Sequence, residues 1–213
     1  GRQANAQFVC TLHHDIHVSQ EAIDSLHRAQ ALVVLHGRGI AGLPAALHSK
    51  ARVILQSANR RRPLGKTGHH LNVVVAGHLR SEKSPETIFA TARLLRNMAG
   101  IRLIHIGKAL DPELADQATA TMQAYPGYRW RGALPHDAVR DAIQRAHVLV
   151  HPSRMEGGAN VVIEAITSGT PVLASAVDGN IGLLGEDYPG YFPWGDAPSL
   201  AAMLTRLRLE LTT

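Results

Sequence analysis

Short apolar runs, most of them without polar alternation, recur along the chain between stretches with helical spacing. Runs rich in Val, Ile and Leu that lack a polar face are typical of parallel strands covered on both sides. They predict strands at residues 8–12, 31–35, 52–55, 72–76, 102–106, 128–131, 148–151 and 171–174. The stretches between them predict helices at residues 20–29, 85–98, 112–124, 137–146, 161–168 and 198–211. Repeated strand–helix–strand order predicts a parallel sheet wrapped by helices.

Three of the predicted helices are preceded by a residue suited to capping. Ser84 and Asp111 each stand directly before a proline, and Asp196 lies a little before the last helix. A polar side chain followed by proline at the first helical position is typical of a helix N-terminus. We therefore expect these three side chains to cap the helices that follow them.

Residues 56–70, QSANRRRPLGKTGHH, interrupt this order because they have no apolar period and concentrate Arg, Gly, Pro and His. Such a composition is typical of a linker. After it we expect a complete doubly wound, Rossmann-like domain over residues 71–195 and a C-terminal helix over residues 196–213. Residues 1–55 carry three predicted strands, which indicates only part of a second domain.

Composition narrows the class of protein. The 213 residues are 45% hydrophobic, enough to bury a sizeable core, so a disordered chain is excluded. The single cysteine, Cys10, excludes a disulfide framework and fits a reducing compartment. No apolar run has the length needed to span a bilayer, and the N-terminus lacks a signal-peptide layout. We therefore expect a soluble cytoplasmic protein.

The charge balance favours anionic ligands. The formal net charge is +5, but the basic residues are scattered, and the only dense run is Arg60–Arg61–Arg62. Aromatic residues make up 4% of the chain, too few for a platform on which single-stranded bases would stack. We expect a small phosphorylated ligand rather than nucleic acid or a membrane.

Two glutamates bracket a Gly-Gly pair in HPSRMEGGANVVIEAITSGTP, residues 151–171. The segment follows a predicted strand, at the sheet edge where open parallel sheets bind ligands. Gly157 and Gly158 allow close approach of the backbone, and the N–H groups of Asn160, Val161 and Val162, at a helix start, suit a diphosphate.

Carboxylates accept hydrogen bonds from paired hydroxyls, so Glu164 suits a ribose and Glu156 suits a sugar on the other side of the phosphates. The spacing therefore favours a nucleotide-sugar. The motif alone leaves open that Glu164 only complements the helix N-terminus and that the glycines form an ordinary turn.

Two further segments supply candidate ligand contacts. After the first complete strand, Lys83 can place a point charge against a diphosphate, although an ordinary surface role is open. Before the helix at 137–146, backbone at Arg131 to Leu134 is a candidate contact for a base. His151 ends a strand beside the same cleft, where both a structural hydrogen bond and a ligand contact are open.

Together GHLRSEK, GALPHDAVRDAIQRAHVLVHPS and MEGGANVVIEAITSGTPVLAS resemble the donor-binding domain of retaining GT-B glycosyltransferases with an E-x₇-E motif. This resemblance covers about residues 71–195 and implies an α/β fold of the GT-B type, with one complete Rossmann-like domain and a partial second one. It implies that Glu156 contacts the donor hexose, Glu164 the ribose and Lys83 the diphosphate, with Glu156 and Lys83 as catalytic residues. That group commonly has Arg where this chain has His78, a weaker ligand for phosphate.

Residues 157–196, with GHLRSEKSP and HIGKALDPELA, are more closely similar to the selenosugar synthases of selenoneine biosynthesis. The resemblance implies transfer of a sugar from UDP-glucose or UDP-N-acetylglucosamine to selenophosphate, without a metal or other cofactor. It also implies that Gly179, Asn180 and Gly182 form a loop that faces the cleft, with Asn180 on the acceptor side. A plain connector is the alternative for this loop.

The N-terminal part departs from this family. Where an acceptor-side segment like LTGTDLY is expected, residues 11–17 read TLHHDIH, which leaves His14 and Asp15 as acceptor-side candidates. The cluster of His13, His14 and His17 is open to a metal, a catalytic or a partner-facing role, but no Cys or helix-spaced Glu completes a metal motif.

Three functions therefore stay open: a selenosugar synthase, an ordinary glycosyltransferase with a hydroxyl acceptor, and a truncated UDP-sugar-binding module without full activity. A module of this kind would need a missing segment, a partner chain or a homo-oligomer.

Overall fold

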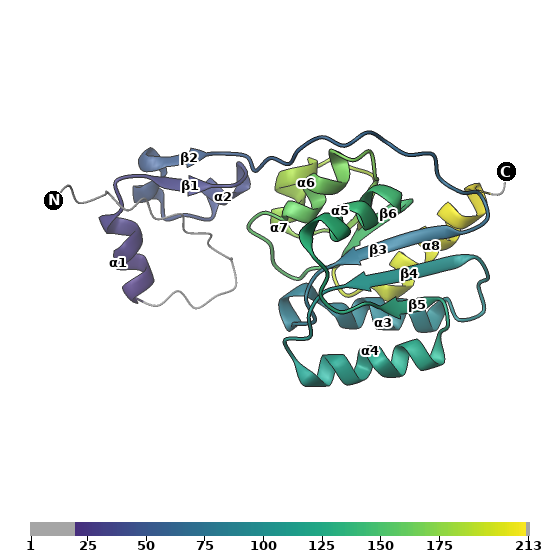
Figure 1. Cartoon of the computed structure of the whole chain (residues 1–213). Helices are drawn as coiled ribbons and strands as arrows, with labels where there is room; N and C mark the ends of the chain where they lie inside the picture. Colours follow the sequence, from purple (N-terminus) through teal and green to yellow (C-terminus); the bar gives the residue numbers. More distant parts are fainter. Residues whose placement is uncertain (1–19, 212–213) are drawn as a thin grey trace.

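The computed structural model describes residues 20–211 (Figure 1). Its strands are β1 (Leu32–Val34), β2 (Ala51–Val53), β3 (Leu71–Ala76), β4 (Ile101–Ile106), β5 (Tyr128–Trp130), β6 (Val148–His151), β7 (Val172–Ser175) and β8 (Tyr191–Phe192). Its α-helices are α1 (Gln20–Arg28), α2 (Arg38–Ala41), α3 (Pro85–Leu94), α4 (Pro112–Ala124), α5 (His136–Arg145), α6 (Asn160–Ile166), α7 (Asp178–Leu184) and α8 (Ala197–Glu210). Two 3₁₀ turns, Ala45–Lys50 and Ser81–Lys83, complete the described elements.

Six parallel strands form the main sheet in the order β5-β4-β3-β6-β7-β8. The chain enters the sheet at β3, moves outward through β4 and β5, and then crosses back to place β6 on the other side of β3. Ligands of such sheets bind beyond the carboxyl ends of the strands where this reversal occurs. The ends of β3 and β6 are therefore the expected place for a site, and the predicted parallel sheet of an α/β fold is confirmed.

Helices cover both faces of this sheet, so its strands are buried on both sides (Figure 1). Along β3, Val73 and Val75 join a core with α3, α4 and α8, while Val74 joins a core with α5 and α6. This two-sided burial is the reason for the unbroken apolar runs in the sequence. No helix within residues 20–211 is long and apolar enough to cross a bilayer.

A buried histidine lies inside the first of these cores. His105 on β4 has its Nδ1 at 3.0 Å from the hydroxyl oxygen of Tyr128 and its Nε2 at 3.2 Å from the carbonyl oxygen of Gly77. A neutral ring that donates from Nε2 to the carbonyl and accepts the Tyr128 hydroxyl at Nδ1 satisfies both contacts. The side chain of Phe89 packs edge-on against Tyr128 at 5.9 Å between ring centroids. Burial lowers the pKa of His105 to about 4, so the ring is neutral at pH 7.

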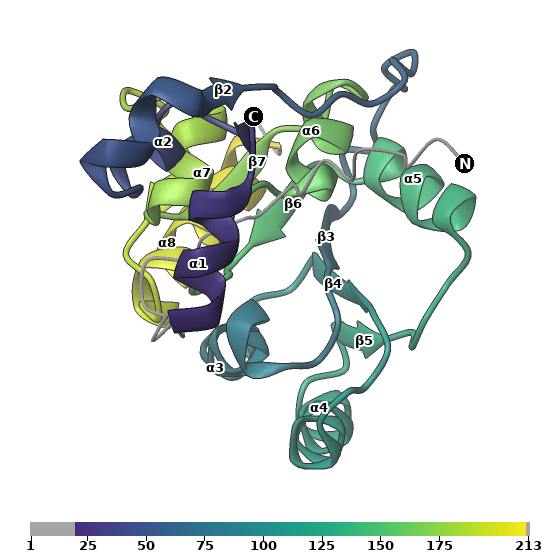
Figure 2. The ribbon, with the colours of Figure 1, turned by 90° about the vertical axis from the view of Figure 1, so that its left-hand side faces the viewer.

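The strands β1 and β2 form a separate two-stranded parallel sheet with its own small core. This unit lies against α7, as the second view shows (Figure 2). The guanidinium of Arg38 contacts Asp178 at 2.7 Å and Glu186 at 2.9 Å, which joins α2 to the two ends of the α7 segment.

The segment between β2 and β3 has no helix or strand of its own, as expected for a linker, but it is tightly held. The backbone N–H of Arg61 donates to the carbonyl of Thr167 at 2.9 Å, and its guanidinium donates to Asp141 at 2.6 Å. The side-chain amide of Gln144 donates to the carbonyl of Arg62 at 2.7 Å. The linker therefore runs across α5 and α6 as a fixed strap. The domain boundaries placed around it stay a prediction.

Several local expectations need correction. The sequence analysis missed α2, α7 and β8, which are short, and the helix predicted at 85–98 ends at Leu94. Ser84 does not cap α3: its φ is +46°, and its hydroxyl oxygen accepts from Trp194 Nε1 at 2.9 Å. Asp111 and Asp196 do cap, accepting from the N–H groups of Glu113 and Ser199. The strand predicted at 8–12 lies outside the described residues.

Candidate functional site

A cavity of about 320 Å³ opens at the carboxyl ends of β3 and β4, beside the loop that follows β6. Its lining is mostly apolar and includes the charged side chains of Lys83 and Glu156. It brings together seven of the predicted site residues: His78, Lys83, Leu134, Glu156, Gly158, Asn160 and Val161. These residues come from three separate segments of the chain, which the switch in strand order brings to one point of the sheet edge.

Glu156 is the centre of an ion-pair cluster in this cavity. Its Oε1 lies in contact with Lys83 Nζ and 3.0 Å from His151 Nε2. The Glu156 side chain is 8% exposed and that of His151 is 2% exposed. The hydroxyl of Ser153 lies 3.2 Å from the same imidazole nitrogen. Oε2 of Glu156 has no hydrogen-bond or ion-pair partner among residues 20–211, so it is the oxygen left for a ligand.

The neighbours of Glu156 favour its ionised, negatively charged form. Burial raises the pKa of Glu156, but the hydrogen bond and charge of His151, together with those of Lys83, outweigh burial and hold the pKa well below its usual range. Glu156 is therefore an acceptor of hydrogen bonds at any pH near neutrality, as contact with sugar hydroxyls requires.

The loop after β4 orients the imidazole of His78, the candidate phosphate ligand. Its Nδ1 accepts from the backbone N–H of Lys108 at 3.0 Å. The neutral ring therefore carries its proton on Nε2, which is a donor suited to a phosphate oxygen.

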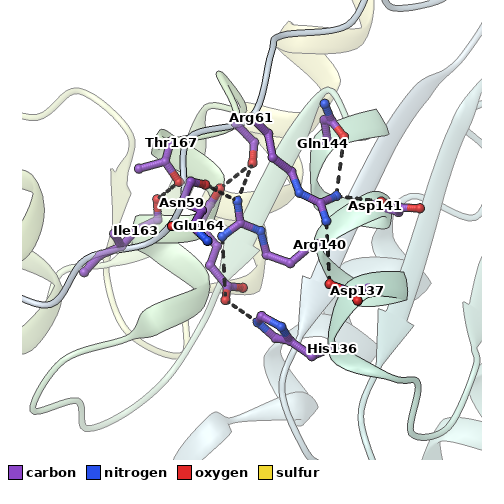
Figure 3. Close-up of polar contacts among 11 residues, drawn as sticks. Asn59, Arg61, His136, Asp137, Arg140, Asp141, Gln144, Ile163, Glu164 and Thr167 are labelled. Atoms are coloured by element: carbon purple, nitrogen blue, oxygen red, sulfur yellow. Dashed lines mark hydrogen bonds and ion pairs between the residues drawn. The ribbon is translucent and has the colours of Figure 1, made fainter.

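The second glutamate lines a different cavity, of about 440 Å³, enclosed by the linker, the start of α5 and the start of α6. Glu164 is 6% exposed, and its Oε1 lies 2.7 Å from His136 Nε2 and 3.9 Å from Arg140 Nη1 (Figure 3). Asn160 lines both cavities, so they adjoin at the start of α6. The sequence placed the two carboxylates along one helix mouth; the structure places them on two sides of it.

The start of α6 offers fewer free N–H groups than expected. The backbone N–H of Val162 donates to the carbonyl of Ala159 at 3.0 Å and is therefore not available to a ligand. The expectation for Val162 was wrong because α6 begins with a tight turn. Asn160 and Val161 keep their place on the wall of the first cavity.

Other predicted residues do not meet at the site. Arg131 is exposed and lines neither cavity, and Gly157 is buried and lines neither cavity. Asn180 is fully buried, and its side-chain amide donates to the carbonyl of Ser175 at 3.0 Å. The loop predicted from Gly179 to Gly182 is the helix α7, which turns Asn180 inward; this corrects its acceptor-side placement. His14 and Asp15 lie outside the described residues.

Gly179 has a clear structural role at the site. A Cβ on this residue would overlap the carbonyl oxygen of Glu156, so only glycine lets α7 pack directly on the Glu156 backbone.

The sequence analysis also missed functional candidates. His136 and Arg140 contact Glu164, and their positions in the first two turns of α5 gave no motif. The spacing of His136 and Arg140 along the predicted helix can be seen in the sequence. That this helix packs beside the one that carries Glu164 cannot. Within residues 20–211, no group of three or more His, Cys, Asp or Glu side chains is arranged to hold a metal ion.

Sequence comparison identifies a family. The model of the family described as "Glycosyl transferases group 1" matches residues 70–209. "Glycosyltransferase 1 domain-containing protein 1" of Xenopus tropicalis is 26% identical over 187 residues, 87% of this chain and 52% of that protein. D-inositol 3-phosphate glycosyltransferase of Streptomyces coelicolor is 30% identical over 169 residues, 75% of this chain and 36% of that protein. The chain thus spans about half or less of these relatives.

Solved structures give the same fold at low identity. HepE of Anabaena in complex with UDP-glucose has a TM-score of 0.76 at 14% identity, over 91% of this chain and 58% of HepE. A TarM mutant of S. aureus, in complex with fondaparinux, alpha-GlcNAc-glycerol and UDP, has a TM-score of 0.75 at 13% identity, over 94% of this chain and 44% of TarM.

Proposed function

This chain belongs to the glycosyl transferases of group 1, and on that premise we propose that it binds a UDP-sugar and transfers the sugar to a small anionic acceptor. The observation that carries the proposal is the pair of adjoining cavities at the switch in strand order. One holds Lys83 and Glu156, the other holds Glu164, and Asn160 belongs to both. A ligand with hydroxyls at two ends and a dianion between them suits this arrangement of charges.

Each group then has a role in binding. Glu164 accepts hydroxyls of the ribose, Lys83 and the Nε2 proton of His78 bind the diphosphate, and Glu156 accepts hydroxyls of the donor sugar. The apolar wall at Leu134 suits the flat face of uracil. Complexes of HepE with UDP-glucose and with UDP and glucose support a UDP-sugar as the donor class.

The chemical step follows from the charges of these residues. As the bond between C1 of the sugar and the diphosphate oxygen breaks, its electron pair stays on that oxygen, and Lys83 stabilises the growing negative charge. We take retention of configuration at C1 and independence from metal from the resemblance to the E-x₇-E glycosyltransferases. No strong general base is required if the acceptor is already an anion.

Selenophosphate is the acceptor we favour. Its selenium lone pair forms the new bond to C1, and water then takes the phosphoryl group, so the products are a 1-seleno-sugar, UDP and phosphate. The similarity of residues 157–196 to selenosugar synthases supports this choice. A hydroxyl acceptor is the second candidate, supported by D-inositol 3-phosphate glycosyltransferase and TarM among the similar proteins.

The direct test is to incubate the chain with UDP-glucose or UDP-N-acetylglucosamine and selenophosphate and to follow UDP release. Release that depends on selenophosphate supports the synthase. Binding of UDP-sugar without release supports the binding module. The donor proposal fails if calorimetry detects no binding of UDP at millimolar concentration.

Replacing Glu156 separates the sugar from the nucleotide. We expect Glu156→Gln to weaken UDP-glucose binding by about tenfold or more, the scale of a hydrogen bond to a charged group. Binding of UDP should change by less than about threefold. Lys83 keeps its charge, and the diphosphate no longer competes with the Glu156 carboxylate for the ammonium. Titration calorimetry with both ligands measures this difference.

Glu82→Gln is the matched control, since Glu82 is exposed, lies one residue before Lys83 and does not line the cavity. Equal losses for UDP and UDP-glucose in Glu156→Gln would contradict the sugar contact.

A further inference from the structure

We propose that Arg140 is a positioning residue for the nucleotide site, which holds the Glu164 carboxylate in place by tying it to the linker. The proposal rests on the assignment of Glu164 to the ribose, and it adds a residue that belongs to no recognisable sequence motif.

The Arg140 guanidinium is buried between three elements. Arg140 is 4% exposed, and its Nη2 donates to the carbonyl oxygen of Asn59 at 2.7 Å. Its Nη1 lies 3.9 Å from Glu164 Oε1 (Figure 3). Ser168 Oγ is 3.5 Å from Nη2. The guanidinium therefore joins the linker to α6, across α5. A buried cation of this kind needs a nearby carboxylate, so its position and that of Glu164 depend on each other.

The contacts divide the two oxygens of Glu164. Both His136 and Arg140 lie against Oε1. Oε2 has no hydrogen-bond or ion-pair partner in the part of the chain that is described. The protein thus holds Oε1 of Glu164 in place and leaves Oε2 for a hydroxyl of the ligand. Arg140 and Glu164 both line the cavity in which that ligand would lie.

Of the two groups on Oε1, Arg140 is the better anchor. The His136 side chain is 73% exposed, whereas that of Arg140 is 5% exposed. An exposed partner is screened by water and free to rotate, and a buried guanidinium is neither. The Nε of Arg140 is also buried and has no partner in the described residues. The contacts of the guanidinium with Asn59 and Glu164 are therefore the ones that compensate for its burial.

The test compares UDP with 2′-deoxy-UDP, which lacks one ribose hydroxyl. We expect wild type to prefer UDP by about tenfold, as for one hydrogen bond to a charged acceptor. Glu164→Gln should reduce this preference to about twofold or less, and Arg140→Gln should reduce it to the same extent. A general loss of structure would lower both affinities equally and leave their ratio unchanged. Arg140→Lys serves if the Gln variant does not fold, because it keeps the charge but cannot form the same paired contacts.

Gln144→Ala is the matched control. Gln144 also holds the linker, through the carbonyl of Arg62, but does not touch Glu164. It should keep the tenfold preference. In the double variant Arg140→Gln/Glu164→Gln, the ratio should equal that of Glu164→Gln alone.

The outcomes separate the two proposals. If wild type prefers UDP and Glu164→Gln abolishes that preference while Arg140→Gln or Arg140→Lys retains it, the positioning role is overturned and the donor assignment stands. If wild type binds UDP and 2′-deoxy-UDP equally, or binds neither, the assignment of Glu164 to the ribose fails first.

Discussion

Replacing Lys83 with methionine is expected to lower UDP affinity about 100-fold, close to 3 kcal/mol. Two effects add. The diphosphate loses an ammonium, and the Glu156 carboxylate, which is 8% exposed, loses its lysine partner and then faces the phosphates. Truncating one member of a buried charge pair costs more than the lost contact because the other charge stays behind.

Titration calorimetry with UDP measures the effect. Lys108→Met is the control, since Lys108 is exposed, lies near His78 and does not line the cavity. This substitution removes the same formal charge as Lys83→Met. Equal losses in Lys83→Met and Lys108→Met would mean that the general positive field, rather than a specific contact, attracts UDP.

Acid is expected to destabilise the wild-type fold through His105, and His105→Gln should remove that contribution. The pKa of His105 is lowered to about 4 by burial, from the ordinary value of 6.5. Between pH 6.5 and 4, His105 therefore binds a proton in the unfolded chain but stays neutral in the folded protein. Stability from this group is complete above pH 6.5 and decreases as the pH falls toward 4. The total is about 3 kcal/mol, at 1.36 kcal/mol for each pH unit between the two values.

Urea unfolding at several pH values between 7 and 4 measures this slope. A glutamine at 105 does not titrate, so the variant should lose less stability than wild type over that range. His27→Gln on exposed α1 is the control and should follow wild type. Parallel curves for wild type and His105→Gln would contradict a buried neutral histidine.

The sequence predicted the main sheet well because local signals and burial agree there. The helix α4 has the bounds that were predicted, with Asp111 before Pro112 at its start, and β6 is an apolar run that ends at His151 as expected. The missed elements are short, and α7 contains Gly179 and Gly182, which disfavour helix in isolation. Packing on Glu156 and the small sheet supplies what its propensity lacks.

The site was predictable in its residue types and less so in its arrangement. Lys83 and Glu156 were placed in the same cleft from the rule about strand ends, and they do line one cavity. Their mutual ion pair was not foreseen, because pattern reasoning assigned each a ligand and no partner within the protein. The separation of Glu164 into a second cavity depends on the path of the linker over α5 and α6. That path is set by contacts such as Arg61 with Asp141, between residues far apart in sequence.

The attachment of the small sheet has a mechanical consequence. Arg38 grips Asp178 and Glu186, and one residue after Asp178 the glycine of α7 rests on the main chain of Glu156. A rotation of the β1–β2 unit that keeps the Arg38 ion pairs must therefore move α7 and the main chain of Glu156 with it. All three charged side chains are well exposed, so these ion pairs by themselves contribute little to the attachment. These contacts therefore couple the position of the small sheet to that of the loop that carries Glu156.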